Sequence, residues 1–255
     1  MIVKDLKSES SEIRGQKLKM ISPQIEETVP STSRRQDAYE TILHAIVFGE
    51  LRPDARLDEK SLALDFGIGI AGVRDALFRL SLEGLVIRQP RIGTKVAGLD
   101  VQELQDVFES RVILECQCAR IAALRADAHD VVKLRTLIEE YDGVAHTRDF
   151  RKLFEIDQIF HRTVAHSTKN RLLEQQVVVL HNNASRFWYI GVARLEPEAL
   201  TKSLQSHIDV VNAISNRNAQ AAEKAMLSCV ADFPGFADHY MNNQQVYDAS
   251  FLARK

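Results

Sequence analysis

Residues 36–97 carry a series of apolar stripes and helix breakers whose order few small folds can accommodate. The first stripe has helical spacing and ends at Gly49 and Pro53. Asp58 is placed to cap a second helix that runs to about residue 66, and Gly67 supplies the turn before a third helix at about 72–83. The stripe of the first helix consists of Tyr39, Ile42, Leu43, Ile46 and Val47.

Two short apolar runs follow these helices at residues 85–87 and 95–97, with a turn between them. Gly93 lies in that turn, where it permits a positive φ. Three helices and a hairpin in this order predict a winged helix-turn-helix, a module that places its third helix in a DNA groove. The alternative is a small helical domain with a solvated charged face.

Local charge favours DNA binding. The formal net charge of the 255-residue chain is −2, so general affinity for nucleic acid is excluded. From residue 74 to residue 98, however, five basic residues stand against Asp75 and Glu83. This local excess falls on the third helix and the hairpin, the elements expected to meet phosphates. The basic residues are Arg74, Arg79, Arg88, Arg91 and Lys95.

Composition and patterning divide the chain into four parts. Residues 1–33 are Ser-rich and weakly periodic, which predicts a flexible tail, and 34–98 form the expected winged helix. Residues 99–243 are expected to be an all-α effector-binding and dimerisation domain, and 244–255 a C-terminal tail. No apolar run reaches 18 residues, no secretory signal begins the chain, and the three cysteines form no closed disulfide framework, so we expect a cytoplasmic protein.

The second domain shows helical periodicity throughout, which makes the predicted fold class mainly α: a winged helix-turn-helix followed by a six- or seven-helix bundle. Breakers separate the helices at Gly143, at 167–170, at Gly191 with Pro197, and at 216–218. The expected helices are 101–125, 129–145, 148–167, 170–193, 198–215 and 218–240.

Polar residues interrupt three of the apolar seams in this bundle. Asp157 and His161 are four residues apart and therefore share a helix face. His207 lies ten residues before the turn at Arg217 and Cys229 twelve after it, so an antiparallel hairpin places them at one level. These ligand types suit a divalent metal. The alternative is a hydrogen-bonded Asp157–His161 pair, with the other two side chains filling core space.

The segment 36–98 resembles the GntR family of bacterial transcription regulators. That family commonly has Val-Ser-Arg-Thr-Pro-Val-Arg-Glu-Ala-Leu where this chain has residues 68–77, so Val73–Leu77 keep the pattern and the first half does not. Gly69 and Ala71 replace residues that cap the helix and touch phosphate, and Ile70 replaces a base-reading arginine. A missing cap costs about 1 kcal/mol, so we expect the first turn of the third helix to fray without DNA.

The resemblance implies a set of DNA contacts. Arg74 is the expected base contact, and Ile70 and Ala71 remain able to touch a thymine methyl group. Weak or altered specificity is the alternative, because an isoleucine loses the guanine contact worth about 1–3 kcal/mol. The remaining expected contacts, mainly to phosphate, are Lys60, Arg79, Arg91, Thr94 and Lys95.

Residues 101–240 resemble the FCD ligand-binding domain of the FadR-type branch of that family. Many members hold zinc or a similar ion with an Asp-x-x-x-His pair and two histidines about 22 residues apart. Asp157, His161 and His207 match this pattern, and Cys229 replaces the last histidine, which favours zinc. Arg111 on an inward stripe is expected to bind a carboxylate, either that of Glu115 or that of an effector. Gln176 and Asn183 are expected to line the same cavity.

The predicted function is therefore that of a DNA-binding regulator, expected to be a repressor, which responds to a small organic acid. The family reads palindromic sites, which implies a homodimer on double-stranded operator DNA. One alternative is a metal-free regulator that responds to an acyl thioester. A helical metalloenzyme is the other, but the chain has no His-Glu-x-x-His motif, nucleophile elbow or phosphate loop, so we predict no enzyme activity.

Overall fold

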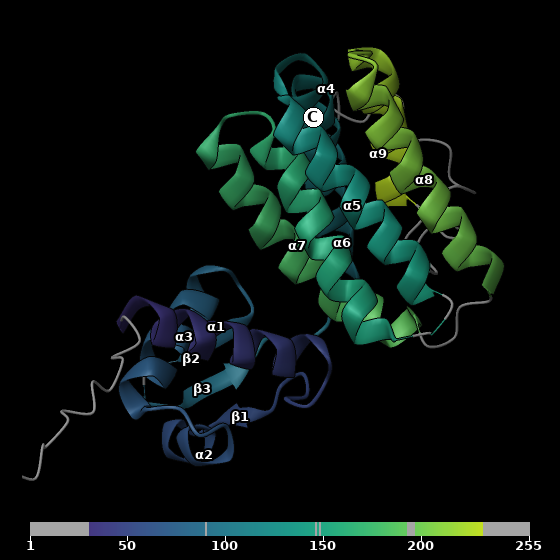
Figure 1. Cartoon of the computed structure of the whole chain (residues 1–255). Helices are drawn as coiled ribbons and strands as arrows, with labels where there is room; N and C mark the ends of the chain where they lie inside the picture. The colour runs from purple at the N-terminus through teal and green to yellow at the C-terminus, as the bar shows by residue number, and fades with distance from the viewer. Residues whose placement is uncertain (1–30, 90, 146, 148, 193–196, 232–255) are drawn as a thin grey trace, which may run out of the picture.

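The computed structural model describes residues 31–231, apart from residues 90, 146, 148 and 193–196. The described chain forms an N-terminal domain with a small sheet and a larger helical bundle beside it (Figure 1). This arrangement confirms the predicted fold class. No helix in the described part of the chain is long and apolar enough to cross a membrane.

The N-terminal domain has the predicted helices and one strand more than predicted. Its third helix begins at Ile70, two residues earlier than expected, and the sheet has the order β1-β3-β2 with antiparallel pairs. The unpredicted β1 has only two residues, too few for an alternating pattern to show in the sequence. The elements are α1 (Ser31–Val47), β1 (Arg56–Leu57), α2 (Glu59–Asp65), α3 (Ile70–Leu82), β2 (Val86–Gln89) and β3 (Gly93–Val96).

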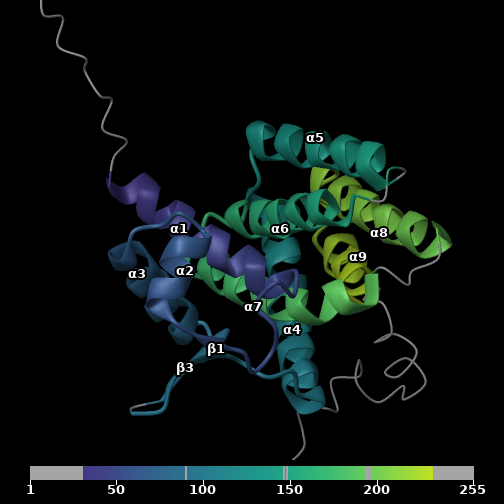
Figure 2. The ribbon, with the colours of Figure 1, turned by 90° about the horizontal axis from the view of Figure 1, so that it is seen from below.

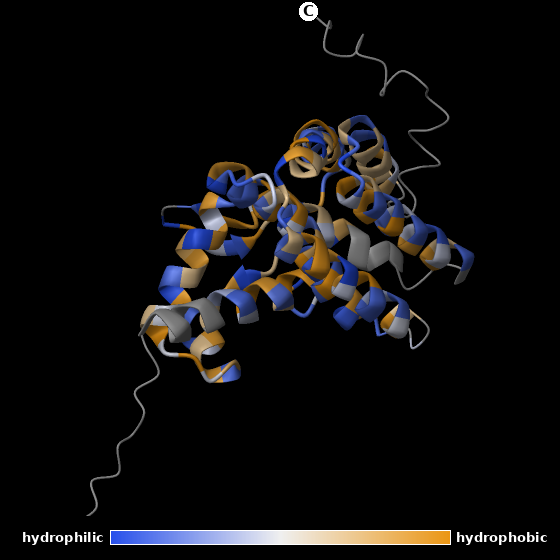
Figure 3. Cartoon of the chain, turned by 45° about the horizontal axis from the view of Figure 1, so that its top comes forward, coloured by the Kyte–Doolittle hydropathy of each residue, from blue (hydrophilic) through white to orange (hydrophobic). Residues whose placement is uncertain are grey.

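The bundle consists of six helices whose bounds agree with the sequence-based ranges to within about two residues where the structure describes them. Asp100 and Asp149 cap α4 and α6 by accepting hydrogen bonds from first-turn backbone amides. Hydrophobic and hydrophilic residues are both present along the helices (Figure 3), as expected for helices with one face in the core. The helices are α4 (Val101–Arg125), α5 (Ala128–Ala145), α6 (Phe150–His166), α7 (Arg171–Val192), α8 (Pro197–Ser215) and α9 (Ala219–Ala231).

Two predicted boundaries differ from the structure or lie beyond it. α1 begins at Ser31, so residues 31–33 are helical and do not belong to the predicted tail. The rest of that tail, the end of the last predicted helix and the predicted tail 244–255 lie outside the described residues.

The seam of α7 that faces the bundle core is shifted by one residue from the positions of Gln176 and Asn183, which were expected to face the cavity. Val177, His181 and Ala184 face the core, and residues 181–186 are all buried. Gln176 is exposed, so its expected place in a cavity is wrong. The shift arises because α7 packs against α4 and α6 on one side and against α1 on another (Figure 2), so that more than one of its faces is covered.

The bundle also contributes to the core of the N-terminal domain. Phe154 of α6 is 1% exposed and packs edge-on against Phe48, with 5.3 Å between ring centroids. His44 of α1 lies 5.9 Å from the same ring. The two domains therefore share an apolar contact as well as a covalent connection.

The first turn of α3 has no side-chain cap, as predicted. Gly69 is the N-cap residue, its φ of −65° and ψ of 141° suit any residue, and a Cβ built there meets nothing within 4 Å. Gly69→Ser should therefore raise the free energy of unfolding by about 1 kcal/mol and slow amide exchange at residues 70–73. Gly67→Ser is the control: its φ of +64° disfavours any side chain, so stability should fall. Unchanged exchange in Gly69→Ser would contradict fraying of this turn.

Candidate functional site

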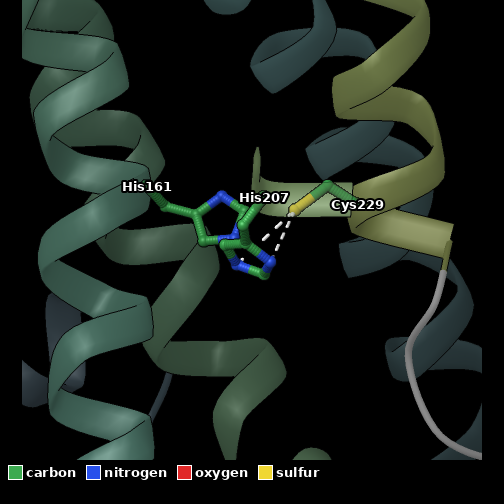
Figure 4. Close-up of side chains that lie close together, drawn as sticks. All are labelled: His161, His207 and Cys229. Carbon is green, nitrogen blue, oxygen red and sulfur yellow. Dashed lines mark hydrogen bonds between the residues drawn. The ribbon is translucent and has the colours of Figure 1, made fainter. Parts of the chain in front are cut away.

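Three bundle helices bring the four predicted metal ligands together. His207 Nε2 lies 2.9 Å from Asp157 Oδ1, and His161 Nε2 lies 3.8 Å from the same oxygen. Cys229 Sγ lies 3.5 Å and 3.6 Å from the two ring nitrogens of His207. The donor atoms of His161, His207 and Cys229 all fall within 4.8 Å of one another, facing a common centre (Figure 4). We call these four residues the polar site.

Both histidines of the polar site are hydrogen-bonded through Nδ1 to an acceptor outside the site. His161 Nδ1 donates a short hydrogen bond to Glu115 Oε2, and His207 Nδ1 donates to the backbone carbonyl of Ser203 at 2.7 Å. Each ring therefore presents Nε2 to the centre of the site. An acceptor bonded to Nδ1 in this way fixes the orientation of a histidine ring and raises its basicity, as in many metal sites.

His181 on α7 also faces the polar site and was not among the residues predicted from the sequence. Its Nε2 donates to Asp157 Oδ2 at 2.8 Å, and its Nδ1 lies 3.3 Å from Ser185 Oγ. Asp157 is thus bonded through one oxygen to His207 and through the other to His181. The signal for His181 was present in the sequence as a histidine four residues after Val177, but it requires the correct register of α7.

Arg111 lies beside the polar site, and its carboxylate partner comes from the protein. Arg111 Nε donates to Glu115 Oε1 at 2.6 Å, and both residues are buried, at 6% and 1% exposure. Glu115 therefore bridges Arg111 and His161 and uses both of its oxygens. Of the two predicted partners, the structure provides Glu115.

Burial and ion pairing oppose each other at every charged group of this cluster. Burial raises the pKa of Glu115, but Arg111 and His161 outweigh it and hold the pKa at about 2. Burial lowers the pKa of His161, whereas the charges of Glu115 and Asp157 raise it to about 9. At neutral pH the carboxylate is therefore ionised and the imidazole is protonated.

The other half of the site follows the same rule. Burial raises the pKa of Cys229, but His207 outweighs this effect and lowers the pKa to about 6. Burial lowers the pKa of His207, but Cys229 and Asp157 raise it well above its usual range. Asp157 has its pKa held well below the usual range, mainly by His161, against the effect of burial. The cluster then carries three negative and three positive groups, which balances its charge in a buried position.

The donor set fits a divalent zinc ion. Two imidazole nitrogens, one thiolate and one carboxylate oxygen are four accepted zinc ligands, and zinc sites in proteins are commonly four-coordinate. Zinc would displace the protons of His161 and His207, so the net charge of the buried cluster would not change. Soft thiolate also disfavours magnesium and calcium.

Of the other predicted effector residues, neither lines the polar site. Asn183 Nδ2 donates to the backbone carbonyl of Glu83 at 2.8 Å, so its side chain points to the N-terminal domain. Gln176 is exposed on another face of α7. The reason for both errors is the one-residue shift of the α7 seam described above.

The predicted DNA contacts lie on two different faces of the N-terminal domain. Lys60, Ile70, Ala71, Arg74 and Arg91 are exposed on α2, on α3 and at the tip of the hairpin, and Thr94 and Lys95 are half-buried on β3. Arg74 Nε on α3 lies 2.5 Å from Glu59 Oε2 on α2, and the arginine side chain is exposed. Lys95 Nζ lies 2.6 Å from Asp54 Oδ1.

Arg79 lies apart from the other predicted DNA contacts. Its guanidinium stacks 3.6 Å above the ring of Tyr39, and its Nε lies 3.1 Å from Glu83 Oε1. Both partners belong to the side of the N-terminal domain that faces the bundle. Its predicted phosphate contact remains a prediction, and the structure places the side chain at the boundary between the domains.

Comparison with known proteins covers both domains. Residues 34–96 match the family described as bacterial regulatory proteins, gntR family, and residues 106–232 match the FCD domain. The repressor RspR of Escherichia coli is 23% identical over 197 residues, which cover 77% of this chain and 86% of RspR. The repressor GlaR of the same species is 25% identical over 196 residues, with 74% of this chain and 89% of GlaR covered.

Solved structures agree in fold. Escherichia coli McbR/YncC superposes with a TM-score of 0.71 at 18% identity, covering 83% of this chain and 98% of that one. A GntR regulator of Rhodococcus sp. RHA1 gives a TM-score of 0.62 at 19% identity, with 83% and 98% covered. These relatives are transcription regulators, in agreement with the prediction against an enzyme. On these matches, the chain belongs to the GntR family of bacterial transcription regulators and carries an FCD domain after its DNA-binding domain.

Proposed function

We propose that this regulator is a cytoplasmic, homodimeric repressor whose bundle binds a divalent metal, zinc above all, and through it a small organic acid. One observation carries the proposal. The four side chains of the polar site converge, and Nδ1 of each histidine is already hydrogen-bonded elsewhere, which leaves Nε2 for a metal. Zinc can expand from four to five ligands, so an ion held by these four side chains could also take up a carboxylate. Arg111 next to the same cluster is already paired with Glu115, so the metal would be the group that binds the acid.

Repression and dimerisation rest on the relatives and on symmetry. RspR and GlaR are both named repressors, and two-fold proteins read two-fold operators. In a dimer, a change in the orientation of the two DNA-binding domains alters their spacing and so their fit to two half-sites. We expect the effector to act in this way.

The effector part is tested with DNA selected from a random pool, in a binding assay with zinc-loaded protein. A panel of small di- and tricarboxylates should include one that changes the DNA affinity, and His161→Ala should abolish that response. The metal-free alternative, a regulator responsive to acyl thioesters, predicts a protein that retains no zinc after purification and an unaltered response in His161→Ala. Elemental analysis and this variant separate the two.

Arg74→Ala should lower affinity for the selected DNA by about tenfold to a hundredfold, because one arginine–base contact is worth about 1–3 kcal/mol. The loss of affinity should be largest for DNA sequences that contain the guanine contacted by Arg74. DNA sequences without this guanine should bind wild type and variant with equal affinity. Arg135→Ala, an exposed arginine on α5, is the matched control and should bind as wild type does. Equal affinity of Arg74→Ala and wild type would show that Arg74 does not read a base.

A further inference from the structure

Three consecutive residues of α7 connect the polar site with the DNA-binding domain. His181 holds Asp157 Oδ2 at 2.8 Å. Asn182 donates from Nδ2 to the Tyr39 hydroxyl at 3.0 Å, and Asn183 donates to the carbonyl of Glu83 at 2.8 Å. The first of these residues faces the bundle core, and the next two face the N-terminal domain.

A second connection runs from α6 through the neighbour of Asp157. Gln158 Nε2 donates to Asn182 Oδ1 at 2.7 Å. Tyr39 donates its hydroxyl hydrogen to Glu83 Oε2 at 2.6 Å and accepts from Asn182. Asn182 is fully buried and Tyr39 is 3% exposed, so each polar group depends on its partner in the network. We call Tyr39, Glu83, Gln158, Asn182 and Asn183 the junction.

The chain segment between the domains is bonded to the same helix. Arg186 lies one turn after Asn182 and is 3% exposed. Its Nη1 donates to the carbonyls of Ala97 and Gly98 at 3.3 Å and 3.2 Å, and its Nη2 donates to Glu103 at 2.8 Å. A rotation or shift of α7 would therefore move both the junction and the entry to α4.

The junction can open without leaving a void. Tyr39, Glu83, Gln158 and Asn182 form part of the wall of a groove of about 1210 Å³ between the two domains, which is open to solvent. Water in this groove can replace the lost hydrogen bonds, so opening of the junction does not leave its polar groups unpaired. The contact is thus suited to two arrangements, one docked and one released.

We propose that the junction transmits occupancy of the polar site to the DNA-binding domain, with His181 as the positioning residue between them. Asp157 Oδ2 is bonded to His181, whereas Oδ1 is the oxygen bonded to His207, so a metal held by Asp157 at the polar site would shift this carboxylate and alter its bond to His181. The change in the Asp157–His181 hydrogen bond moves α7. This movement alters the hydrogen bonds that Asn182 and Asn183 donate to the Tyr39 hydroxyl and the Glu83 carbonyl. The proposal rests on the proposed function only in that the polar site takes a metal. The shift between the docked and the released arrangement that a metal can cause is limited by the difference in metal affinity between the two.

The test uses the full chain, zinc chloride and two readouts: zinc bound per chain, and amide hydrogen exchange at residues 38–48 and 83–97. Zinc should change exchange in these segments of the wild type at least severalfold. In Tyr39→Phe, which keeps the ring under Arg79 but lacks the hydroxyl, zinc should still bind one per chain while the change in exchange disappears. Asn182→Ala should behave alike, and His181→Leu should in addition bind zinc about 10–100-fold more weakly.

Gln117→Ala is the matched control, because it removes another amide link between helices, that from Gln117 on α4 to Glu223 on α9, which does not include a junction residue. It should respond to zinc as wild type does. A wild-type response that persists in Tyr39→Phe and Asn182→Ala would overturn the proposal, as would zinc binding to wild type with no change in exchange. If no zinc binds, the metal part of the proposed function fails and the transmission fails with it, and the zinc content identifies that case.

Discussion

Glu115→Gln should lower the free energy of unfolding of the metal-free protein by about 3–5 kcal/mol. The substitution keeps the shape of the side chain but removes the charge that both Arg111 and His161 face in a buried position. Breaking a buried pair from one side leaves the remaining charges without compensation, which is the costly case. Urea unfolding of both proteins at pH 7 measures the difference.

The same difference should depend on pH. The pKa of Glu115 falls from about 4.5 in the unfolded chain to about 2 in the folded one. A depressed carboxyl pKa contributes stability that is complete above pH 4.5 and is lost as pH falls through about 2. The difference in the free energy of unfolding between wild type and Glu115→Gln should therefore decrease as pH falls from 4.5 to about 2. Glu223→Gln is the control, since its partner Arg120 is exposed and the pair is worth about 0–1 kcal/mol. An equal decrease in the free energy of unfolding in Glu115→Gln and Glu223→Gln would show that burial does not make the Glu115 pairs more important than an exposed pair.

Cys229→Ala should lower zinc affinity by more than about 100-fold, whereas Cys229→His should retain binding. The alanine variant removes one of four donors, while the histidine variant restores the ligand type that the resemblance to FadR-type regulators implies at this position. Zinc at 100 times its dissociation constant should stabilise the wild type by about 2.7 kcal/mol and Cys229→Ala by almost nothing. Thermal unfolding with and without zinc measures both.

Zinc binding at pH 7.5 should release about two protons, one each from His161 and His207. The pKa of His161 is raised to about 9 and that of His207 well above its usual range, so both rings are protonated before the metal enters. Zinc affinity should therefore increase as pH rises toward 9. Calorimetry in two buffers of different protonation enthalpy counts the protons. Metal binding without proton release would place the ion elsewhere.

Local signals in the sequence were sufficient for the helices and for most of their ends. Asp58 caps α2 as predicted, Gly67 adopts the positive φ expected of a turn, and Gly69 begins α3 without a side-chain cap. These features depend on contacts within three or four residues, which the sequence contains in full. β1 was missed because a two-residue strand exists only through its pairing with β3.

The polar site was predicted in part for a similar reason. The spacing of Asp157 and His161 defines one helix face, and the hairpin geometry aligns His207 with Cys229. His181 was missed and Asn183 was assigned to the wrong side because α7 is buried on several faces. Periodicity identifies an inward face only when the opposite face is exposed.

The sequence by itself determined the fold class and the pairing of Asp157 with His161 and of His207 with Cys229, because these follow from apolar periodicity and local spacing, while the resemblance to FCD domains implied that the two pairs belong to one site. Only the tertiary structure decided that Glu115 joins Arg111 to His161, that His181 holds Asp157, and that Asn182 and Asn183 reach the DNA-binding domain. These contacts join residues 24 to 143 positions apart, apart from the Arg111–Glu115 pair. Their partners are chosen by how the helices pack, which the period of any one helix does not contain.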